Sequence, residues 1–506
     1  MGLALACILA SPEARTAGEL EAGPLWSRHR LTLETGAATE ALGPLWQTTE
    51  VWRGAAAEGL GPDEWPPADR LEDPAVVSRI ARGLTLAPLF SWRHRPEVDA
   101  RFFEFLYPVV TYARYGTESR FQIFQVLSFS GGRTQQGARD RTWTVFPFFF
   151  LRHSEDPNRR YAAFWPVYGR LQNRLFRDET RFVLWPLYVQ TRKRDVVTDN
   201  YLVPFVHVRH GDGLKGWQVW PFYGRETKAL TWVTNATGQA EAVGGHEKQF
   251  VLWPFYGRAE LGLGTTNEVH QRALLPFYSA LDSPARTSRT WLWPFGLSRT
   301  EDRAIGYRQT ALLWPVFIRA RGPGKHEDRF WPFYGETRYA EWTSRFILWP
   351  LWRQRRIERD PLRRETDQFG LVLYRRTVSR REDTGTENRL LSLWPLYVRK
   401  TDANGRTWAQ APAPLTALLP NNDKVRRLYG HFFGLWRTEA DGQTGRRSTS
   451  VLWNLYRRER SPERKKCSLL FGLVQYESGR TGRRWKLFFL PLGGGGPSRA
   501  EPTTTP

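Results

Sequence analysis

A short phrase, tryptophan-proline-aromatic, recurs along most of the chain and constrains its fold more than any other feature. Consecutive copies of the proline lie 17 to 22 residues apart wherever no copy is degenerate. The complete pairs are Trp165 and Pro166, Trp185 and Pro186, Trp220 and Pro221, Trp253 and Pro254, Trp293 and Pro294, Trp314 and Pro315, Trp331 and Pro332, Trp349 and Pro350, and Trp394 and Pro395. We therefore expect roughly twenty copies of a tandem repeat, with these pairs as its structural core.

Each repeat has the profile of a β-strand followed by a polar turn. The run 182–189 is continuously apolar or aromatic, and segments such as 402–405 supply the Asp, Asn and Gly residues that tight turns favour. A proline in every copy would break a helix of this length. The sequence therefore predicts an all-β chain with one strand per repeat.

The proline and the apolar faces suggest how these strands are arranged. Alternate side chains of the run 182–189 are apolar on both faces, so we expect its centre to be covered on both sides. Proline lacks the backbone donor that a sheet ladder needs. Its recurrence at one level predicts a repeated bend or bulge that curls the sheet.

Three architectures fit these observations. The favoured one is a long, curled antiparallel meander that is closed or nearly closed and therefore barrel-like. The alternative is a β-solenoid with one coil per repeat. The third is an outer-membrane barrel of about twenty strands, although Pro, Leu and Tyr side chains would line a wide aqueous lumen poorly.

The repeat signal divides the chain into four regions. Residues 1–20 have a short apolar stretch without a basic start, which predicts a truncated signal segment. Residues 21–83 lack a steady period and are expected to form an irregular cap. Residues 84–492 form the predicted β-repeat domain, and the Gly-, Pro- and Thr-rich residues 493–506 a disordered tail.

The chain is strongly basic, with 74 Lys and Arg residues against 51 Asp and Glu residues and a net charge of +23. A basic surface attracts polyanions, so the partners to consider are anionic lipid, lipopolysaccharide and acidic glycans. Much of the arginine can equally serve to solubilise strand ends. The sequence contains no recognisable module for sequence-specific nucleic-acid binding.

The search for catalytic chemistry gives no convincing motif. His207 and His210 are three residues apart and would point to opposite faces of a strand, which is unsuitable for sharing a metal. The segment 322–325 has the wrong spacing for a phosphate-binding loop. Acidic pairs such as 301–302 lie in polar segments. We predict no catalytic, cofactor-binding or metal-binding residue.

The repeated Leu-Trp-Pro-Leu-Tyr units resemble an uncharacterised family of repeat proteins from Gram-negative bacteria. The segments 419–422 (Leu-Pro-Asn-Asn) and 466–472 carry the same resemblance, which covers nearly all of the chain after about residue 85. The resemblance brings no established activity and implies a location in the cell envelope.

Three functional hypotheses follow. The first is a non-enzymatic structural or binding protein of the cell envelope, in the periplasm or associated with the outer membrane. The second is a secreted basic solenoid that binds polyanions or glycans. The third is an enzyme acting on envelope polysaccharide, which would require carboxylates to converge in a groove.

Overall fold

The computed structural model describes residues 26–52, 80–133, 137–174, 176–234, 240–479 and 482–492. The predicted signal segment 1–20 and the predicted tail 493–506 lie outside the described residues. These residues are all-β apart from one α-helix and short 3-10 turns. No helix among these residues is both long and apolar enough to cross a membrane.

The chain divides into two compact units. Unit 1 consists of residues 1–119 and 372–506, and unit 2 of residues 120–371. The first segment of unit 1 contains β1 (Ser27–Arg30), β2 (Gly36–Ala41), η2 (Gly43–Leu45), β3 (Trp46–Val51), β4 (Ala81–Leu86), β5 (Phe90–Arg95), η4 (Pro96–Val98), β6 (Ala100–Phe105) and β7 (Val110–Tyr115). Strands β1 to β3 lie in the range predicted to be an irregular cap, so regular β-structure starts earlier than residue 84.

The second segment of unit 1 contains strands on both sides of the α-helix. They are β35 (Tyr374–Arg381), β36 (Glu387–Leu393), β37 (Tyr397–Thr401), β38 (Arg406–Ala411), helix α5 (Asp423–Phe433), β39 (Trp436–Asp441), β40 (Arg447–Val451), β41 (Tyr456–Arg460), β42 (Arg464–Leu469), β43 (Val474–Gly479), β44 (Gly482–Leu487) and β45 (Leu490–Leu492). Strand β8 (Glu118–Ile123) contains the boundary between the units.

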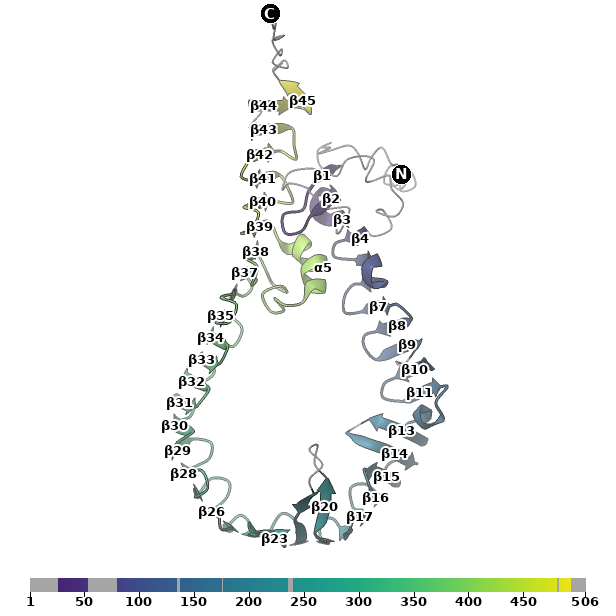
Figure 1. Ribbon diagram of the computed structural model, residues 1–506, viewed down its shortest axis with the longest axis vertical. Helices are drawn as coiled ribbons and strands as arrows, with labels where there is room; N and C mark the ends of the chain where they lie inside the picture. Colours follow the sequence, from purple (N-terminus) through teal and green to yellow (C-terminus); the bar gives the residue numbers. More distant parts are fainter. Residues whose placement is uncertain are drawn as a thin grey trace, which may run out of the picture. The chain divides into compact units, whose positions relative to one another are not determined.

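Unit 2 is built from short strands that follow one another along the chain (Figure 1). They are β9 (Leu127–Arg133), β10 (Arg139–Val145), β11 (Phe149–Ser154), η5 (Pro157–Arg159), β12 (Tyr161–Phe164), β13 (Tyr168–Arg174), β14 (Arg177–Val183), β15 (Tyr188–Lys193), β16 (Val196–Tyr201), β17 (Val206–Gly211), β18 (Leu214–Val219), β19 (Tyr223–Lys228), β20 (Thr231–Thr234), β21 (Ala240–Val243), β22 (Gly245–Val251), β23 (Tyr256–Leu263), β24 (Val269–Leu274), β25 (Tyr278–Asp282), β26 (Arg286–Trp291), β27 (Leu297–Asp302), β28 (Tyr307–Leu312), β29 (Phe317–Gly322), β30 (Lys325–Phe330), β31 (Tyr334–Tyr339), β32 (Trp342–Ile347), β33 (Trp352–Arg359) and β34 (Leu362–Phe369).

Each repeat of about 20 residues folds into two strands, and the expectation of one strand per repeat is wrong. In the run 182–189, strand β14 ends at Val183 and β15 begins at Tyr188, so Trp185 and Pro186 lie in a tight turn. Leu187 donates its backbone N–H to the carbonyl oxygen of Leu184 at 2.8 Å and closes this turn. Proline cannot donate to a ladder, and a turn needs no donor at that position.

The strands form one long antiparallel meander, as predicted. Within each unit, strands pair with their neighbours in the chain, as β14 pairs with β13 and β15; β19 instead pairs with β22, because β20 and β21 form a separate hairpin among the described strands. This antiparallel order excludes the solenoid alternative, whose coils would stack strands in parallel. The sheet is not closed: no ladder among the described strands joins β1 to β45.

Unit 1 has a true interior, because its two chain segments pack on each other. Thr32 donates a hydrogen bond to Ser448 at 2.9 Å, and the Tyr429 hydroxyl of α5 donates to the carbonyl oxygen of Tyr107 at 2.7 Å. Figure 1 shows α5 lying between the strands of the two segments. Its Leu428 side chain is 0% exposed. The other buried apolar side chains of this unit include Trp52, Phe102, Val398, Ala413, Ala417 and Val425.

Helix α5 is the element that sequence analysis missed. The Asn422 side chain accepts hydrogen bonds from the backbone N–H groups of Lys424 and Val425, which is the geometry of an N-cap. Asp423 adds an acidic group to the first turn, where the helix dipole favours negative charge. The segment 419–422, which carries part of the family resemblance, also contains this capping signal.

Unit 2 is a single-layer sheet with little interior. Apart from the β20–β21 hairpin and η5, it contains one sheet and no α-helix in the range that the structure describes. The largest group of buried apolar side chains, Tyr161, Ala163, Leu171 and Phe182, gathers on strands β12 to β14. Elsewhere buried apolar side chains are few: Ala311 and Ile318 face each other across β28 and β29 beside Ala320, and Leu214 lies on β18.

Candidate functional site

The turns of unit 2 segregate onto two edges of the sheet. In an antiparallel meander every second turn lies on the same edge. One of these edges collects the apolar turns, and we call it the apolar edge. Its turns are residues 124–126, 146–148, 165–167, 184–187, 202–205, 220–222, 252–255, 275–277, 292–296, 313–316, 331–333 and 348–351. Because strands lie about 4.8 Å apart, neighbouring apolar turns follow at about 10 Å.

The sequence suggested that the tryptophans are covered on both sides, but the tryptophans of the apolar edge are not. Trp185, Trp253, Trp293, Trp314 and Trp349 are between 43% and 55% exposed. Trp165, Trp220 and Trp331 are half-buried. They occupy turns, so they line the edge of the sheet and do not fill an interior. In unit 1, the indole N–H of the half-buried Trp394 donates to the Pro414 carbonyl oxygen at 2.9 Å.

The aromatic rings of successive apolar turns contact one another. The ring centroids of Trp165 and Trp185 are 5.4 Å apart. Trp220 and Trp253 are separated by 5.9 Å, and so are Trp331 and Trp349. Such separations are typical of favourable aromatic pairs. Parts of the apolar edge are therefore packed rows of rings that hold one another in position.

The backbone polar groups of the apolar edge are bonded from turn to turn. The N–H of Trp185 donates to the carbonyl oxygen of Pro166 at 2.7 Å. Trp253 donates in the same way to Pro221 at 2.6 Å. Backbone groups that are already paired can leave water without the penalty of an unmet hydrogen bond. The apolar edge is therefore suited to a weakly polar environment.

The first residue of several apolar turns is a leucine in an unfavourable backbone conformation. Leu184, Leu252 and Leu348 have φ angles of 44°, 48° and 48°. Glycine or asparagine would adopt this left-handed region with less strain than leucine. These leucine side chains are 48% to 53% exposed, so no buried contact compensates for the strain. Strain of this kind concentrates at functional sites, which directs attention to this edge.

Behind the apolar turns the side chains change from apolar to amphipathic to cationic. Tyr256 opens β23 directly after the turn 252–255, and Arg258 follows two residues later. The Arg258 side chain is 50% exposed. At about 3.3 Å per residue, Arg258 lies roughly 7 Å along the strand from Tyr256, its first residue. The same order of Tyr and Arg recurs after Pro166 and Pro221.

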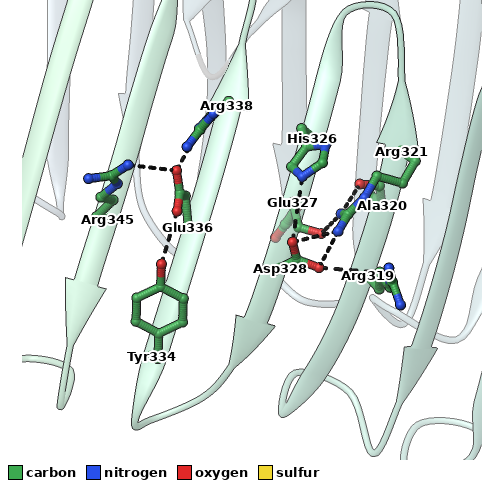
Figure 2. A network of polar contacts seen from close by, with 10 residues as sticks. All are labelled: Arg319, Ala320, Arg321, His326, Glu327, Asp328, Tyr334, Glu336, Arg338 and Arg345. Carbon is green, nitrogen blue, oxygen red and sulfur yellow. Dashed lines mark hydrogen bonds and ion pairs between the residues drawn. The ribbon is translucent and has the colours of Figure 1, made fainter.

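The strands of unit 2 carry networks of ion pairs across their faces. Figure 2 shows Glu336 accepting hydrogen bonds from Tyr334, Arg338 and Arg345. Burial opposes the ionisation of Glu336, but these three donors outweigh it and lower its pKa to about 2. A carboxylate held in its ionised form orders the arginines around it. It is poorly suited to donate a proton as a glycosidase acid does.

The second network in Figure 2 surrounds Asp328. Its carboxylate accepts two hydrogen bonds from Arg321, at 2.6 and 2.8 Å. Arg319 and His326 lie 3.9 and 3.6 Å away. Three basic side chains therefore share one acid at this point. Such networks keep the sheet faces hydrophilic and cationic, in contrast to the apolar edge.

Cross-strand pairs of glycine and phenylalanine stabilise unit 2 beside the apolar edge. Gly224 pairs with Phe250, and Gly335 with Phe346. A Cβ added at Gly335 would lie 2.1 Å from Cε1 of Phe346, so the ring lies directly over the glycine. In the sequence these glycines appear as a Tyr-Gly dipeptide after Trp-Pro-Phe. The sequence alone did not show that a phenylalanine ring lies over the glycine.

A depression of about 620 Å³ lies on strands β17 to β26 of unit 2. It is open beside Gly257, because no atom lies within 4 Å of where a Cβ would be. Basic and aromatic side chains dominate its lining. They include Arg209, Trp217, Lys248, Phe250, Arg258 and Arg272.

The residues tested for catalytic chemistry lie apart from one another or in ordinary polar contacts. His207 Nε2 lies 2.9 Å from the carbonyl oxygen of Pro204, and His210 Nδ1 lies 3.9 Å from Asp199. Lys325, at the end of the segment 322–325, pairs with Glu327 at 3.0 Å. Among the side chains that the structure describes, no three His, Cys, Asp or Glu residues gather as metal ligands would.

Comparison with known proteins adds no relative. No protein-family model matches the chain, and no curated protein matches it.

Proposed function

We propose that this chain is a peripheral membrane-binding protein of the cell envelope, whose apolar edge inserts into the interfacial layer of an anionic bilayer. The observation that carries the proposal is the row of half-exposed tryptophans in hydrogen-bonded turns along one edge of unit 2. Tryptophan and tyrosine favour the boundary between headgroups and acyl chains. This contact needs neither a closed sheet nor a spanning segment.

The order of side chains behind the apolar turns matches the layers of a bilayer surface. Leucine, tryptophan and phenylalanine occupy the tips, tyrosine the first strand position, and arginine the third. Interfacial elements bury their apolar side about 5 to 10 Å deep. Arginines roughly 7 Å along the strand from its first residue then lie at the level of the lipid phosphates. Arg225 and Arg258 pair with Glu247 and Glu260, and 54% and 50% of their side chains remain exposed to meet lipid phosphates.

The net charge of +23 supports an anionic surface over a neutral one. Each arginine near such a surface contributes about 1 kcal/mol of attraction. The predicted partners, anionic lipid and lipopolysaccharide, share phosphate groups that arginine can hold by two hydrogen bonds at once. The envelope location remains part of this proposal.

Vesicle sedimentation tests the proposal. The full chain is mixed with vesicles of phosphatidylcholine containing phosphatidylglycerol, and the bound fraction is measured against lipid concentration. An edge variant replaces Trp253, Trp293 and Trp314 with serine. We expect its apparent lipid affinity to fall at least roughly tenfold, because three side chains of large apolar area no longer leave water.

The matched control replaces Trp143, Trp217 and Trp342 with serine. These tryptophans lie in strands and do not adjoin an apolar turn; Trp143 and Trp217 are 49% and 51% exposed, and Trp342 is half-buried. We expect the control to bind within about twofold of the unmodified chain. Equal losses in both variants, or no binding of the unmodified chain to anionic vesicles, would contradict the proposal.

A second candidate function is the binding of an acidic glycan in the depression on β17 to β26. Its volume of about 620 Å³ and its combination of arginine with tryptophan and phenylalanine suit a sugar ring bearing an acidic group. Saturable binding of a heparin oligosaccharide that Arg258→Ser and Lys248→Ser together abolish would favour it. Unchanged binding by that variant would exclude this site.

A further inference from the structure

Unit 1 contains a cavity of about 170 Å³ at the junction of its two chain segments. A water molecule occupies about 30 Å³ in the liquid, so the cavity has room for more than one. It is smaller than the sites that hold drug-sized ligands or sugar polymers. Strands β1 to β3 contribute one side, and α5 with β38 to β41 contributes the other.

Positive charge dominates the lining of this cavity. Five arginines reach it, against two glutamates, Glu40 and Glu439. The arginines are Arg30, Arg426, Arg427, Arg437 and Arg457. Acids beside the lining pair with three of them: Glu459 with Arg457 at 2.7 Å, and Glu104 with Arg427 and Asp423 with Arg426 at 3.8 Å. Buried charges are costly unless an opposite charge compensates them.

The nearest acids already serve other partners. Glu40 lies 3.6 Å from Arg457 and 3.7 Å from His29, and Gln47 donates to it at 3.1 Å. The Asn454 amide donates to it as well. Burial opposes ionisation of Glu40, but the charges of His29, Arg457 and Arg437 hold its pKa below its usual value. Glu40 is thus ionised and fully engaged.

Arg437 is the cation least well compensated by acids. Its guanidinium donates to Nδ1 of His431, and to Oγ of Ser450 at 3.4 Å. No carboxylate of the described residues lies within ion-pair distance of it. Its neighbours on α5 are only loosely paired, Arg426 with Asp423 and Arg427 with Glu104, both at 3.8 Å. The Nε atoms of all three arginines are buried without a hydrogen-bond partner among the described residues.

His431 is held neutral beside these arginines. Burial and the charges of Arg437, Arg426 and Arg427 lower its pKa well below the ordinary value. An unprotonated Nδ1 is also what the N–H donor of Arg437 requires. The histidine therefore adds a neutral polar wall and no compensating charge.

We propose that this cavity binds a phosphate-type oxyanion, held by the guanidinium groups of Arg426, Arg427 and Arg437. Arginine offers paired donors in the geometry that phosphate oxygens accept. The volume limits the ligand to a small ion or a single headgroup phosphate. The first segment lines the opposite side through β1 to β3, so the bound anion lies between parts of the chain about 400 residues apart.

Thermal unfolding and calorimetry of the full chain test this proposal with inorganic phosphate as the probe. We expect saturable binding and a rise in Tm with phosphate concentration, because the ligand binds only the folded state. Chloride at equal ionic strength is expected to give no saturable effect. The variants Arg437→Gln and Arg426→Gln should each weaken phosphate binding at least roughly tenfold. The control Arg308→Gln changes an arginine that is 79% exposed in unit 2 and should bind normally.

Several results would overturn the proposal. They are the absence of saturable phosphate binding by the unmodified chain, an equal rise in Tm with chloride, and normal phosphate binding by the folded Arg426→Gln variant. If Arg437→Gln fails to fold, as judged by circular dichroism, Arg426→Gln decides alone. Vesicle sedimentation with saturating phosphate distinguishes the source: unchanged lipid binding assigns the site to free phosphate, and reduced binding assigns it to a lipid headgroup.

Discussion

Unit 1 and unit 2 are made of the same kind of hairpin repeat but are stabilised in different ways. Unit 1 folds two distant segments onto each other and buries Leu428, Val398 and Trp52 almost completely. Unit 2 is a single sheet whose large aromatic side chains are mostly half-exposed in turns. The comparison teaches that this repeat can build a sheet by local pairing alone, and that a core appears only where a second element covers it.

The largest expected effect concerns the buried core of unit 1, which has no counterpart in unit 2. Leu428→Ala should destabilise unit 1 by about 2 to 5 kcal/mol, because it leaves a cavity beneath α5. Hydrogen exchange of unit 1 amides measures this loss without assuming that the whole chain unfolds together. The matched change Leu348→Ala, at a leucine 48% exposed on the apolar edge, should alter stability by about 0.5 kcal/mol or less. Equal losses in the two variants would contradict the distinction.

The next effect tests the local pairing of unit 2. Gly335→Ala would place a Cβ 2.1 Å from the Phe346 ring, so the ring must move away. We expect a destabilisation of about 1 to 3 kcal/mol, as for other overpacked sites. Gly257→Ala is the control, because nothing lies within 4 Å of its Cβ position. Hydrogen exchange in β31 and β32 would show the difference, and identical behaviour of the two variants would refute the role of the ring.

The pH dependence sharpens the comparison further. His431 in unit 1 has a pKa well below its ordinary value, so below about pH 6.5 the unfolded chain binds a proton that the folded chain does not. Unit 1 therefore loses stability as the pH falls through this range. The downward shift at His207 in unit 2 also begins with burial, but that side chain is only half-buried. His431→Gln should flatten the fall in stability between pH 6.5 and 5 more than His207→Gln does, measured by urea unfolding at each pH.

The carboxylates of unit 2 make its stability depend on pH in a more acidic range. The pKa of Glu336 is about 2 in the folded chain, below the ordinary value of 4.5. Its stabilising contribution is present above about pH 4.5 and is lost as the pH falls towards 2. Glu336→Gln should remove part of this acid sensitivity, as seen in hydrogen exchange of β31 and β32. An unchanged acid profile would show that the network does not stabilise the sheet.

The smallest expected effect concerns exposed ion pairs. Arg308 lies 3.0 Å from Glu301, with 79% and 43% of the two side chains exposed. Arg308→Ala should change stability by about 1 kcal/mol or less, because solvent and salt screen such pairs. Urea unfolding in low and high salt measures the effect, which should shrink in high salt. A larger loss would mean that unit 2 depends on its charged faces as much as unit 1 depends on its core.

Much of the fold could be predicted from local signals. The alternation of apolar runs with Asp- and Gly-rich turns predicted an antiparallel meander, and the structure confirms it. The place of Trp185 and Pro186 could not be predicted from the same run. A continuous apolar segment reads as one buried strand, whereas the chain turns at its centre and leaves the tryptophan 43% exposed. The repeat was therefore predicted correctly, but the apolar edge that its central turns form was not.

The sequence by itself determined the repeat, the β-structure, the positive charge and the polar turns. These properties depend on neighbours within about 20 residues, which proline and glycine constrain directly. Only the tertiary structure decided that the apolar turns share one edge, that α5 covers a core, and that Arg30 and Arg437 line one cavity. The physical reason is that alternate turns of a meander meet in space, and that distant segments of unit 1 pack through contacts that no local pattern encodes.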